Sequence, residues 1–332
     1  YTIVGISAFR GYYLGNDLKL ILADAIPYLF FLYYFPLKQL LSSEKFRQVS
    51  FNFLISAIIG NFIFTYFTLA GFSSGIFVLQ DSYYHWFRDV AGGKITDYDT
   101  GFFRILLNEQ LLLVPLFLFF FNSFLSFPPK WESRRFVHWI PIFMGMTLLS
   151  VLTINITRIY LVALAVGILF LFSVKNWKRW LAYSASAFIF FMSIFTVTHL
   201  AATKGTSLGW EYLGLRLQSI AMPQTENSSL SRLLLLPKIV EKIKLHPLLG
   251  NGLGDTVTVY SPVFKANITT PHFDWGYLEI AAEMSLVGLL AWLSLIAYCM
   301  WLMKKNKAAL AAIVGLLVIN ITSPVLFHVL GI

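Results

Sequence analysis

The chain is a succession of long apolar runs separated by polar connections. The runs are continuous and do not alternate with period two, so they predict transmembrane helices rather than strands. We expect eight full spans, at approximately residues 17–37, 49–72, 105–127, 136–154, 159–174, 180–200, 276–303 and 308–328. Residues 1–9 resemble the end of a partial helix, and we expect further helices to precede them.

This pattern predicts an all-α polytopic membrane protein with three parts. Residues 1–200 hold the N-terminal transmembrane helices, residues 201–275 form a large loop, and residues 276–332 hold the C-terminal transmembrane helices. The loop is the longest polar interval in a chain with few others. It is therefore the first place to look for chemistry that takes place in water.

Within the loop, residues 228–245 predict an amphipathic helix. At about 100° per residue, one side of this helix carries Lys238, Glu241 and Lys242. The opposite side carries Leu233, Leu236, Ile239, Val240 and Ile243. Arg232 falls in the apolar arc, so we expect it to point toward the protein while the helix lies on the membrane surface or on the bundle. The following sequence, HPLLGNGLGD, predicts a glycine-rich turn.

The composition agrees with a membrane protein. The chain has 332 residues, of which 58% are hydrophobic and 12% charged, whereas soluble domains carry roughly 25% charged residues. The net charge of +9 does not indicate nucleic acid, because the basic residues gather in short clusters between apolar runs. The single cysteine, Cys299, excludes an intrachain disulfide.

The basic clusters predict the orientation of the chain. They occupy every second connection, around Lys38, Lys130, Lys175 and Lys304. Short loops rich in Lys and Arg stay in the cytoplasm, so we expect the alternate connections, including residues 201–275, on the outer face. Basic residues on the outer face run against this bias and require another explanation. These are Arg10, Arg88, Arg104, Arg158, Arg216, Arg232 and His272.

Three of these residues are candidates for chemistry. Arg158 begins the fifth run, where it either anchors a helix end by snorkelling or binds a phosphate through its planar fork. Arg232 either tolerates the interface or acts as a buried cation with a function. His272 is either an ordinary loop histidine or a general base near neutral pH, with Asp274 and Glu279 close enough in sequence to orient it.

The sequence offers little else of this kind. It has no paired histidines at helical spacing, and Asp97 and Asp99 suit a turn better than a metal site, so we expect neither metal nor cofactor. Asp24 lies inside the first run, and the sequence suggests no partner for it.

Three separated segments together resemble the O-antigen ligase and polymerase superfamily of bacterial envelope enzymes. They are TRIYLVALAVGILFLF (157–172), SRLLLLPKIVEKIKLHPLLGNGLGD (231–255) and TPHFDWGYLEIAAEMSLVGLLAWL (270–293). The chain departs from the family pattern at Thr157, where the family has Ser, and at Phe273, where it often has Asn. Residues 285–288 replace its Gly-Leu-x-Gly run.

The resemblance implies a GT-C-like membrane glycosyltransferase that needs no metal. Such an enzyme moves a glycan from an undecaprenyl-diphosphate carrier to an acceptor hydroxyl at the outer face of the bacterial cytoplasmic membrane. Carried over to this chain, Arg158 and Arg232 would hold the diphosphate, and His272 would activate the acceptor. Arg104, Arg216, Asp274 and Glu279 would contribute to substrate binding.

Three alternatives remain open at this stage, one of which is a receptor or scaffold that only binds lipid-linked glycan. A polymerase of lipid-linked repeat units would use the same donor, and the sequence does not separate it from a ligase. A polysaccharide exporter or flippase is the alternative of another class. Such a transporter is expected to have repeated halves and charged residues at mid-membrane, and no repeat is evident here.

Overall fold

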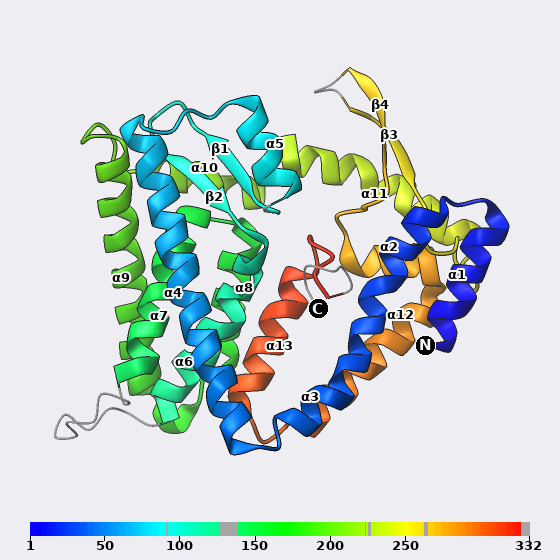
Figure 1. Cartoon of the computed structure of the whole chain (residues 1–332), viewed down its shortest axis with the longest axis horizontal. Helices are drawn as coiled ribbons and strands as arrows, with labels where there is room; N and C mark the ends of the chain where they lie inside the picture. Colours follow the sequence, from blue (N-terminus) through cyan, green and yellow to red (C-terminus); the bar gives the residue numbers. More distant parts are fainter. Residues whose placement is uncertain (91, 127–138, 223, 225–226, 262–264, 327–332) are drawn as a thin grey trace. The chain divides into compact units, whose positions relative to one another are not determined.

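The computed structural model describes residues 1–90, 92–126, 139–222, 224, 227–261 and 265–326. The chain divides into two compact units. Unit 1 comprises Tyr1–Ser43, Leu217–Lys304 and Leu316–Ile332, and unit 2 comprises Glu44–Arg216 and Lys305–Gly315. Helices account for most of both units (Figure 1).

The apolar runs form helices, which agrees with an all-α membrane protein. Among the described residues, five helical stretches have the length and composition to cross a membrane: Leu18–Leu40, Glu44–Ser74, Asn108–Ser126, Val174–Ala202 and Gly276–Leu302. They match the first, second, third, sixth and seventh predicted spans. The other three runs form shorter apolar helices, α7 (Ile140–Asn155), α8 (Arg158–Phe170) and α13 (Lys307–Ile319).

Unit 2 is built around helix α7. Its neighbours are α4 (Glu44–Ser74), α6 (Leu113–Ser126) and α9 (Trp177–Ala202), each of which packs against α7, and α8 packs against α6 (Figure 1). Short 3-10 turns, η2 (Asn108–Leu112) and η4 (Val174–Asn176), lead into α6 and α9. α7 is buried along most of its length because helices surround it.

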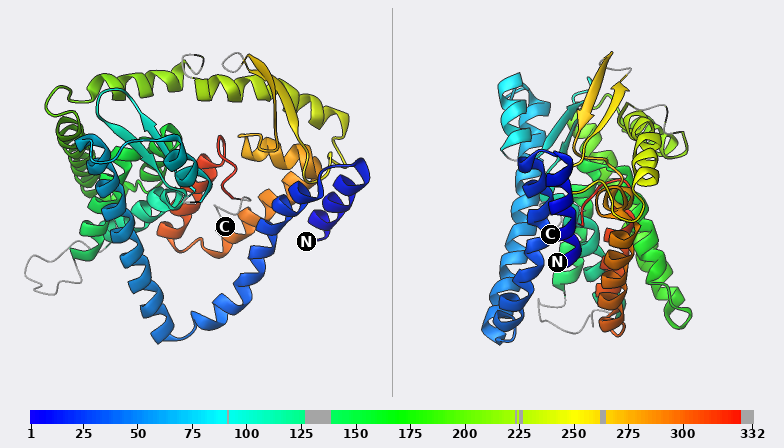
Figure 2. Two further views of the ribbon diagram at one scale, coloured as in Figure 1. Left: turned by 45° about the horizontal axis from the view of Figure 1, so that its top comes forward. Right: turned by 90° about the vertical axis from the view of Figure 1, so that its right-hand side faces the viewer.

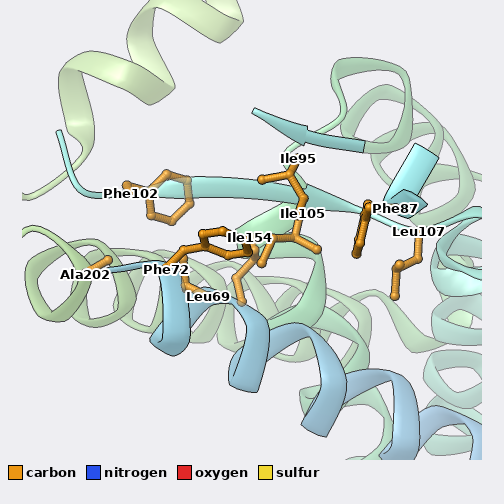
Figure 3. Packing of buried hydrophobic residues seen from close by; sticks show 9 residues of the cluster. All are labelled: Leu69, Phe72, Phe87, Ile95, Phe102, Ile105, Leu107, Ile154 and Ala202. Atoms are coloured by element: carbon orange, nitrogen blue, oxygen red, sulfur yellow. The ribbon is translucent and has the colours of Figure 1, made fainter. Parts of the chain in front are cut away.

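The polar interval after α4 folds into structure that the sequence did not predict. It contains helix α5 (Asp81–Asp89) and an antiparallel hairpin of β1 (Lys94–Asp97) and β2 (Phe103–Leu106). The turn expected at Asp97 and Asp99 joins the two strands, and Asp99 takes a positive φ of 56°. An apolar cluster fixes this layer to α4, α7 and α9 (Figure 3). It comprises Leu69, Phe72, Phe87, Ile95, Phe102, Ile105, Leu107, Ile154 and Ala202.

Unit 1 combines the N-terminal helices with α12 (Gly276–Leu302). α1 (Thr2–Leu14) contacts both α2 (Leu18–Leu29) and α12 (Figure 2). The first predicted span is a continuous helical run, in which η1 (Phe30–Tyr33) and α3 (Tyr34–Leu40) follow α2. A core centred on Ile21, Leu253 and Ile280 joins α2, the glycine-rich turn and α12.

The long loop is more structured than expected. The predicted amphipathic helix is confirmed as α11 (Asn227–Leu245), with Pro237 inside it. The loop also contains helix α10 (Trp210–Ala221) and a hairpin of β3 (Val257–Ser261) and β4 (Ala266–Thr270), and β3 packs against α11 (Figure 2). These three elements were not predicted.

The two faces of α11 differ largely as predicted. Ile239 of the predicted apolar side is buried against β3 and α12, as is Leu235, which was not assigned to that side, and Arg232 is half-buried. Lys238 and Glu241 are exposed and hydrogen-bonded at 2.9 Å, and the Lys238 ammonium lowers the pKa of the Glu241 carboxyl. Lys242 is the exception, because it turns inward and binds both carboxylate oxygens of Asp255, at 2.7 and 2.9 Å.

Three of the basic clusters lie where one helix gives way to the next: Lys38 in the last turn of α3, Lys175 in η4, and Lys304 just after α12. The fourth cluster, Lys130, Arg134 and Arg135, lies outside the described residues, as does the start of the fourth predicted span.

Candidate functional site

In unit 1, a tight turn between β4 and α12 carries His272. The Thr270 hydroxyl accepts a hydrogen bond from the His272 amide at 3.1 Å and donates one to the His272 carbonyl at 3.0 Å. Asp274 takes a positive φ of 59°, a backbone conformation that Asp tolerates better than most residues. The turn leaves the His272 side chain exposed, four residues before Gly276, the first residue of α12.

Arg232 on α11 is held beside this turn. The Trp275 indole donates a hydrogen bond to the Arg232 carbonyl at 2.9 Å. Leu235 and Ile239, on the following turns of α11, pack with Phe273 from the turn. Packing within unit 1 therefore brings Arg232 close to the His272 turn, although the two residues are far apart in the sequence. The helical periodicity of residues 228–245 did not predict this proximity.

The Arg232 guanidinium faces Asp274 without being fully engaged. Its Nε lies 3.7 Å from Asp274 Oδ2, an ion pair that is too long for a hydrogen bond. This Nε is buried, and no hydrogen-bond partner for it occurs among the described residues. The side chain as a whole is 27% exposed, so a donor with unmet capacity stands next to an accessible surface. Such a donor suits an anion.

Glu279 stabilises the His272 turn through a hydrogen bond to its backbone. Its carboxylate is buried on the first turn of α12 and accepts a hydrogen bond from the Phe273 amide at 3.3 Å. This bond places Glu279 next to the turn that carries His272, as its closeness in sequence suggested. In the structure, Glu279 anchors the backbone of the turn.

In unit 2, Arg104 braces the connection that begins α8. It donates to the Asn155 carbonyl at 2.6 Å and to the Thr157 hydroxyl at 2.8 Å. Asn155 is fixed in turn by Gln110, at 2.6 Å. Arg158 is the first residue of α8 and follows this braced connection directly. Arg104 thus positions the start of the helix that carries Arg158.

Arg216 lies between two tyrosine rings. Its guanidinium carbon is 5.4 Å from the Tyr98 ring centre and 5.3 Å from that of Tyr212, within cation–π range. It also donates hydrogen bonds to both tyrosine hydroxyls. Arg216 is 8% exposed. Its contacts with Tyr98 link α10 to the β1–β2 hairpin.

The seven predicted site residues therefore form two groups. Arg232, His272, Asp274 and Glu279 belong to unit 1, where the structure brings them together. Arg104, Arg158 and Arg216 belong to unit 2. The convergence of Arg158, Arg232 and His272 on one cavity stays a prediction.

One feature of unit 1 was missed by the sequence analysis. Helix α12 is broken at Ser285, and two buried carboxyl groups lie near the break, Glu283 and the previously unassigned Asp24. The only sign of this break in the sequence analysis was that residues 285–288 depart from the family pattern. Among the described residues, no group of three or more His, Cys, Asp or Glu side chains is arranged to hold a metal ion.

Comparison of the chain with family models, curated proteins and solved structures finds no match.

Proposed function

We propose that this chain is a membrane glycosyltransferase of the O-antigen ligase type. It transfers a glycan from an undecaprenyl-diphosphate carrier to an acceptor hydroxyl at the outer face of the bacterial cytoplasmic membrane. The proposal includes about eight spans in a GT-C-like arrangement, with the α11 loop outside. Its main support in the structure is the pairing of Arg232 with the His272 turn.

In the proposed reaction, the acceptor oxygen attacks the anomeric carbon of the donor glycan. The bond from that carbon to the diphosphate oxygen breaks, and the leaving diphosphate keeps the electron pair. His272 takes the proton of the acceptor hydroxyl. Arg232 and Arg158 stabilise the charge that develops on the diphosphate, as fixed donors do at other leaving groups.

Several observations support this division of roles. Within the described part of the chain the buried Arg232 Nε has no hydrogen-bond partner, His272 is exposed beside it, and Arg158 begins a helix that Arg104 braces. A lipid diphosphate presents its charge at the membrane boundary, where anchored donor and acceptor gain from proximity. The proposed roles need no metal ion.

The direct test is turnover by the purified protein in lipid vesicles. Vesicles receive an undecaprenyl-diphosphate-linked glycan and candidate acceptors, and products are identified by mass spectrometry. A glycan joined to a different acceptor supports the ligase, and joined donor glycans support the polymerase. Activity is expected to survive EDTA, and loss that a divalent ion restores would contradict the metal-independent mechanism.

A second candidate, a polysaccharide exporter or flippase, is favoured by one observation. The interrupted helix α12 with buried carboxyl groups is typical of ion-coupled transporters. Vesicles that contain labelled lipid-linked glycan but no acceptor separate the two candidates. Movement of the intact lipid across the bilayer without glycosyl transfer would replace the enzyme proposal with the transporter.

A further inference from the structure

Helix α12 consists of two half-helices that meet at Ser285. Ser285 has φ 77° and ψ 172°, a backbone conformation that is costly for any residue other than glycine. Its hydroxyl accepts hydrogen bonds from the Val287 amide at 3.1 Å and the Gly288 amide at 3.4 Å, so Ser285 caps the second half-helix. The side chain of Ser285 therefore stabilises the break in the helix.

The glycine-rich turn replaces the hydrogen bonds that the break removes. The Asn251 amide donates to the Ala282 carbonyl at 2.8 Å, and the Gly252 amide donates to the Glu283 carbonyl at 3.0 Å. On the other side of the break, the Leu286 amide donates to a carbonyl of the same turn. Interrupted helices persist at membrane depth where other protein segments satisfy their backbone, and they often form ion sites.

Two carboxyl groups are buried at this break, and a third is buried one helical turn earlier on α12. Asp24, Glu279 and Glu283 are 8%, 1% and 3% exposed. Asp24 on α2 accepts a hydrogen bond from the Gly254 amide at 2.8 Å, and its carboxyl group lies within hydrogen-bonding reach of that of Glu283. Glu279 lies one helical turn before Glu283 on α12.

One oxygen of Glu283 is consistent with a bound ion or proton. Glu283 Oε1 is buried and has no hydrogen-bond partner among the described residues. A buried acceptor without a partner is costly, and such groups are often explained by a bound ion or proton.

A hydrogen bond between two carboxyl groups requires a proton on at least one of them, because an ionised carboxylate only accepts. Two ionised carboxylates within hydrogen-bonding reach of each other would also repel strongly in a low-dielectric interior. We propose that Asp24 and Glu283 share one bound proton, forming an ion-binding site at the break of α12. The proton comes from water and is exchanged with it.

Two cations of unit 1 are engaged by other groups. Lys242 binds both oxygens of Asp255, and Arg10 donates its Nε hydrogen to the Gly250 carbonyl at 2.5 Å. Tyr28 of α2 is buried in the same core and carries no positive charge. The arrangement of the described carboxyl groups is not that of a metal site.

Infrared spectroscopy of the purified protein in lipid nanodiscs tests this site without any donor or acceptor, so its outcome is separate from that of the proposed enzyme activity. At neutral pH the wild-type spectrum should contain a protonated-carboxyl band that shifts in D2O. Asp24→Asn and Glu283→Gln should each lose this band. Glu241→Gln, which changes an exposed carboxyl of the same unit, should retain it.

Two results would overturn the proposal. One is a band that Glu283→Gln leaves unchanged, which places the proton elsewhere. The other is a wild-type protein without the band whose thermal unfolding temperature rises in NaCl relative to choline chloride at equal ionic strength, which indicates a sodium site. If the variants fail to fold, the wild-type protein alone decides: a band that NaCl does not alter supports the shared proton, and its absence contradicts it.

Discussion

Two arginines of the predicted site show how much the surroundings of a side chain matter. Arg216 is held between two tyrosine rings and bonded to both hydroxyls. Arg232 has only a long ion pair with Asp274, and its buried Nε is unmatched within the described part of the chain. An incoming phosphate would satisfy Arg232 without breaking a strong contact. Of the two, Arg232 is therefore the better candidate for the diphosphate.

We predict that Arg232→Lys lowers turnover by about 10²-fold, the effect of removing one fixed donor from a developing charge. Lysine keeps the charge but cannot form two parallel hydrogen bonds to a phosphate. The measurement is the steady-state rate in vesicles. The matched control is Arg88→Lys at an exposed position on α5, which should leave the rate unchanged. Equal rates for Arg232→Lys and the wild type would remove Arg232 from the mechanism.

We predict that His272→Ala reduces turnover by about 10²–10⁴-fold while donor binding changes little, because proton transfer contributes to the chemical step and not to binding. Binding of the lipid-linked donor and single-turnover rates are measured on the same preparation. His246→Ala provides the control, since His246 is also exposed in unit 1. A parallel loss of binding and turnover would make His272 a binding residue.

At the scale of elements, the glycine-rich turn and the broken helix depend on each other. Gly250 has φ 68°, and a Cβ there would lie 2.2 Å from the Glu283 carbonyl oxygen. Gly252 approaches α1 equally closely, with a Cβ that would lie 2.2 Å from the Gly11 nitrogen. Only glycine allows the turn to reach both helices.

We predict that Gly250→Ala destabilises the protein by about 2–5 kcal/mol, through backbone strain plus overpacking against α12. Gly15→Ala separates the two effects. Gly15 also has a positive φ, of 83°, but a Cβ there meets nothing within 4 Å, so we expect only the strain of about 1–2 kcal/mol. Thermal unfolding in lipid measures both variants. Equal losses would show that the contact with α12 contributes nothing.

The sequence predicted helices well where periodicity or an unbroken apolar run was decisive. α4, α9 and α11 agree with the prediction to within a few residues, apart from the earlier start of α4. The two hairpins were missed because their strands have only four or five residues, too few for a period-two pattern to stand out. The break in α12 was missed because it is stabilised by a turn more than thirty residues earlier in the chain.

The same difference between local patterns and long-range contacts applies to the candidate site. The residue types at Arg158, Arg232 and His272 were evident from sequence because charged groups are rare in this chain. The contacts that define their surroundings were not. The Trp275–Arg232 bond and the Arg104–Asn155 bond join positions 43 and 51 residues apart, and no local pattern encodes such pairs.

At the scale of the whole molecule, eight apolar runs were predicted as spans, and five helical stretches in the described part of the chain meet the length and hydropathy expected of one. α8 and α13 each have 13 residues, fewer than the roughly 20 that an untilted helix needs. If these helices span the membrane, neighbouring protein segments or a locally thinner bilayer must make up the missing length. The number of crossings determines on which side the α11 loop lies.

We predict that Asn267 and Lys305 lie on opposite sides of the membrane. Asn267 is exposed on β4, Lys305 follows α12, and the 27 residues of α12 between them are enough for one crossing. In a Cys299→Ser background, a membrane-impermeant maleimide added outside should label Asn267→Cys in intact cells. It should label Lys305→Cys only after permeabilisation.

Glu211→Cys, exposed on α10, serves as a control because the alternation of basic loops puts it on the same side as Asn267. The result bears on mechanism as well as topology. A donor whose glycan has already crossed the membrane meets Arg232 and His272 only if both lie outside. Labelling of Asn267→Cys and Lys305→Cys from one side would mean that α12 does not cross. The buried carboxyl groups at its break would then need an explanation in water rather than in lipid.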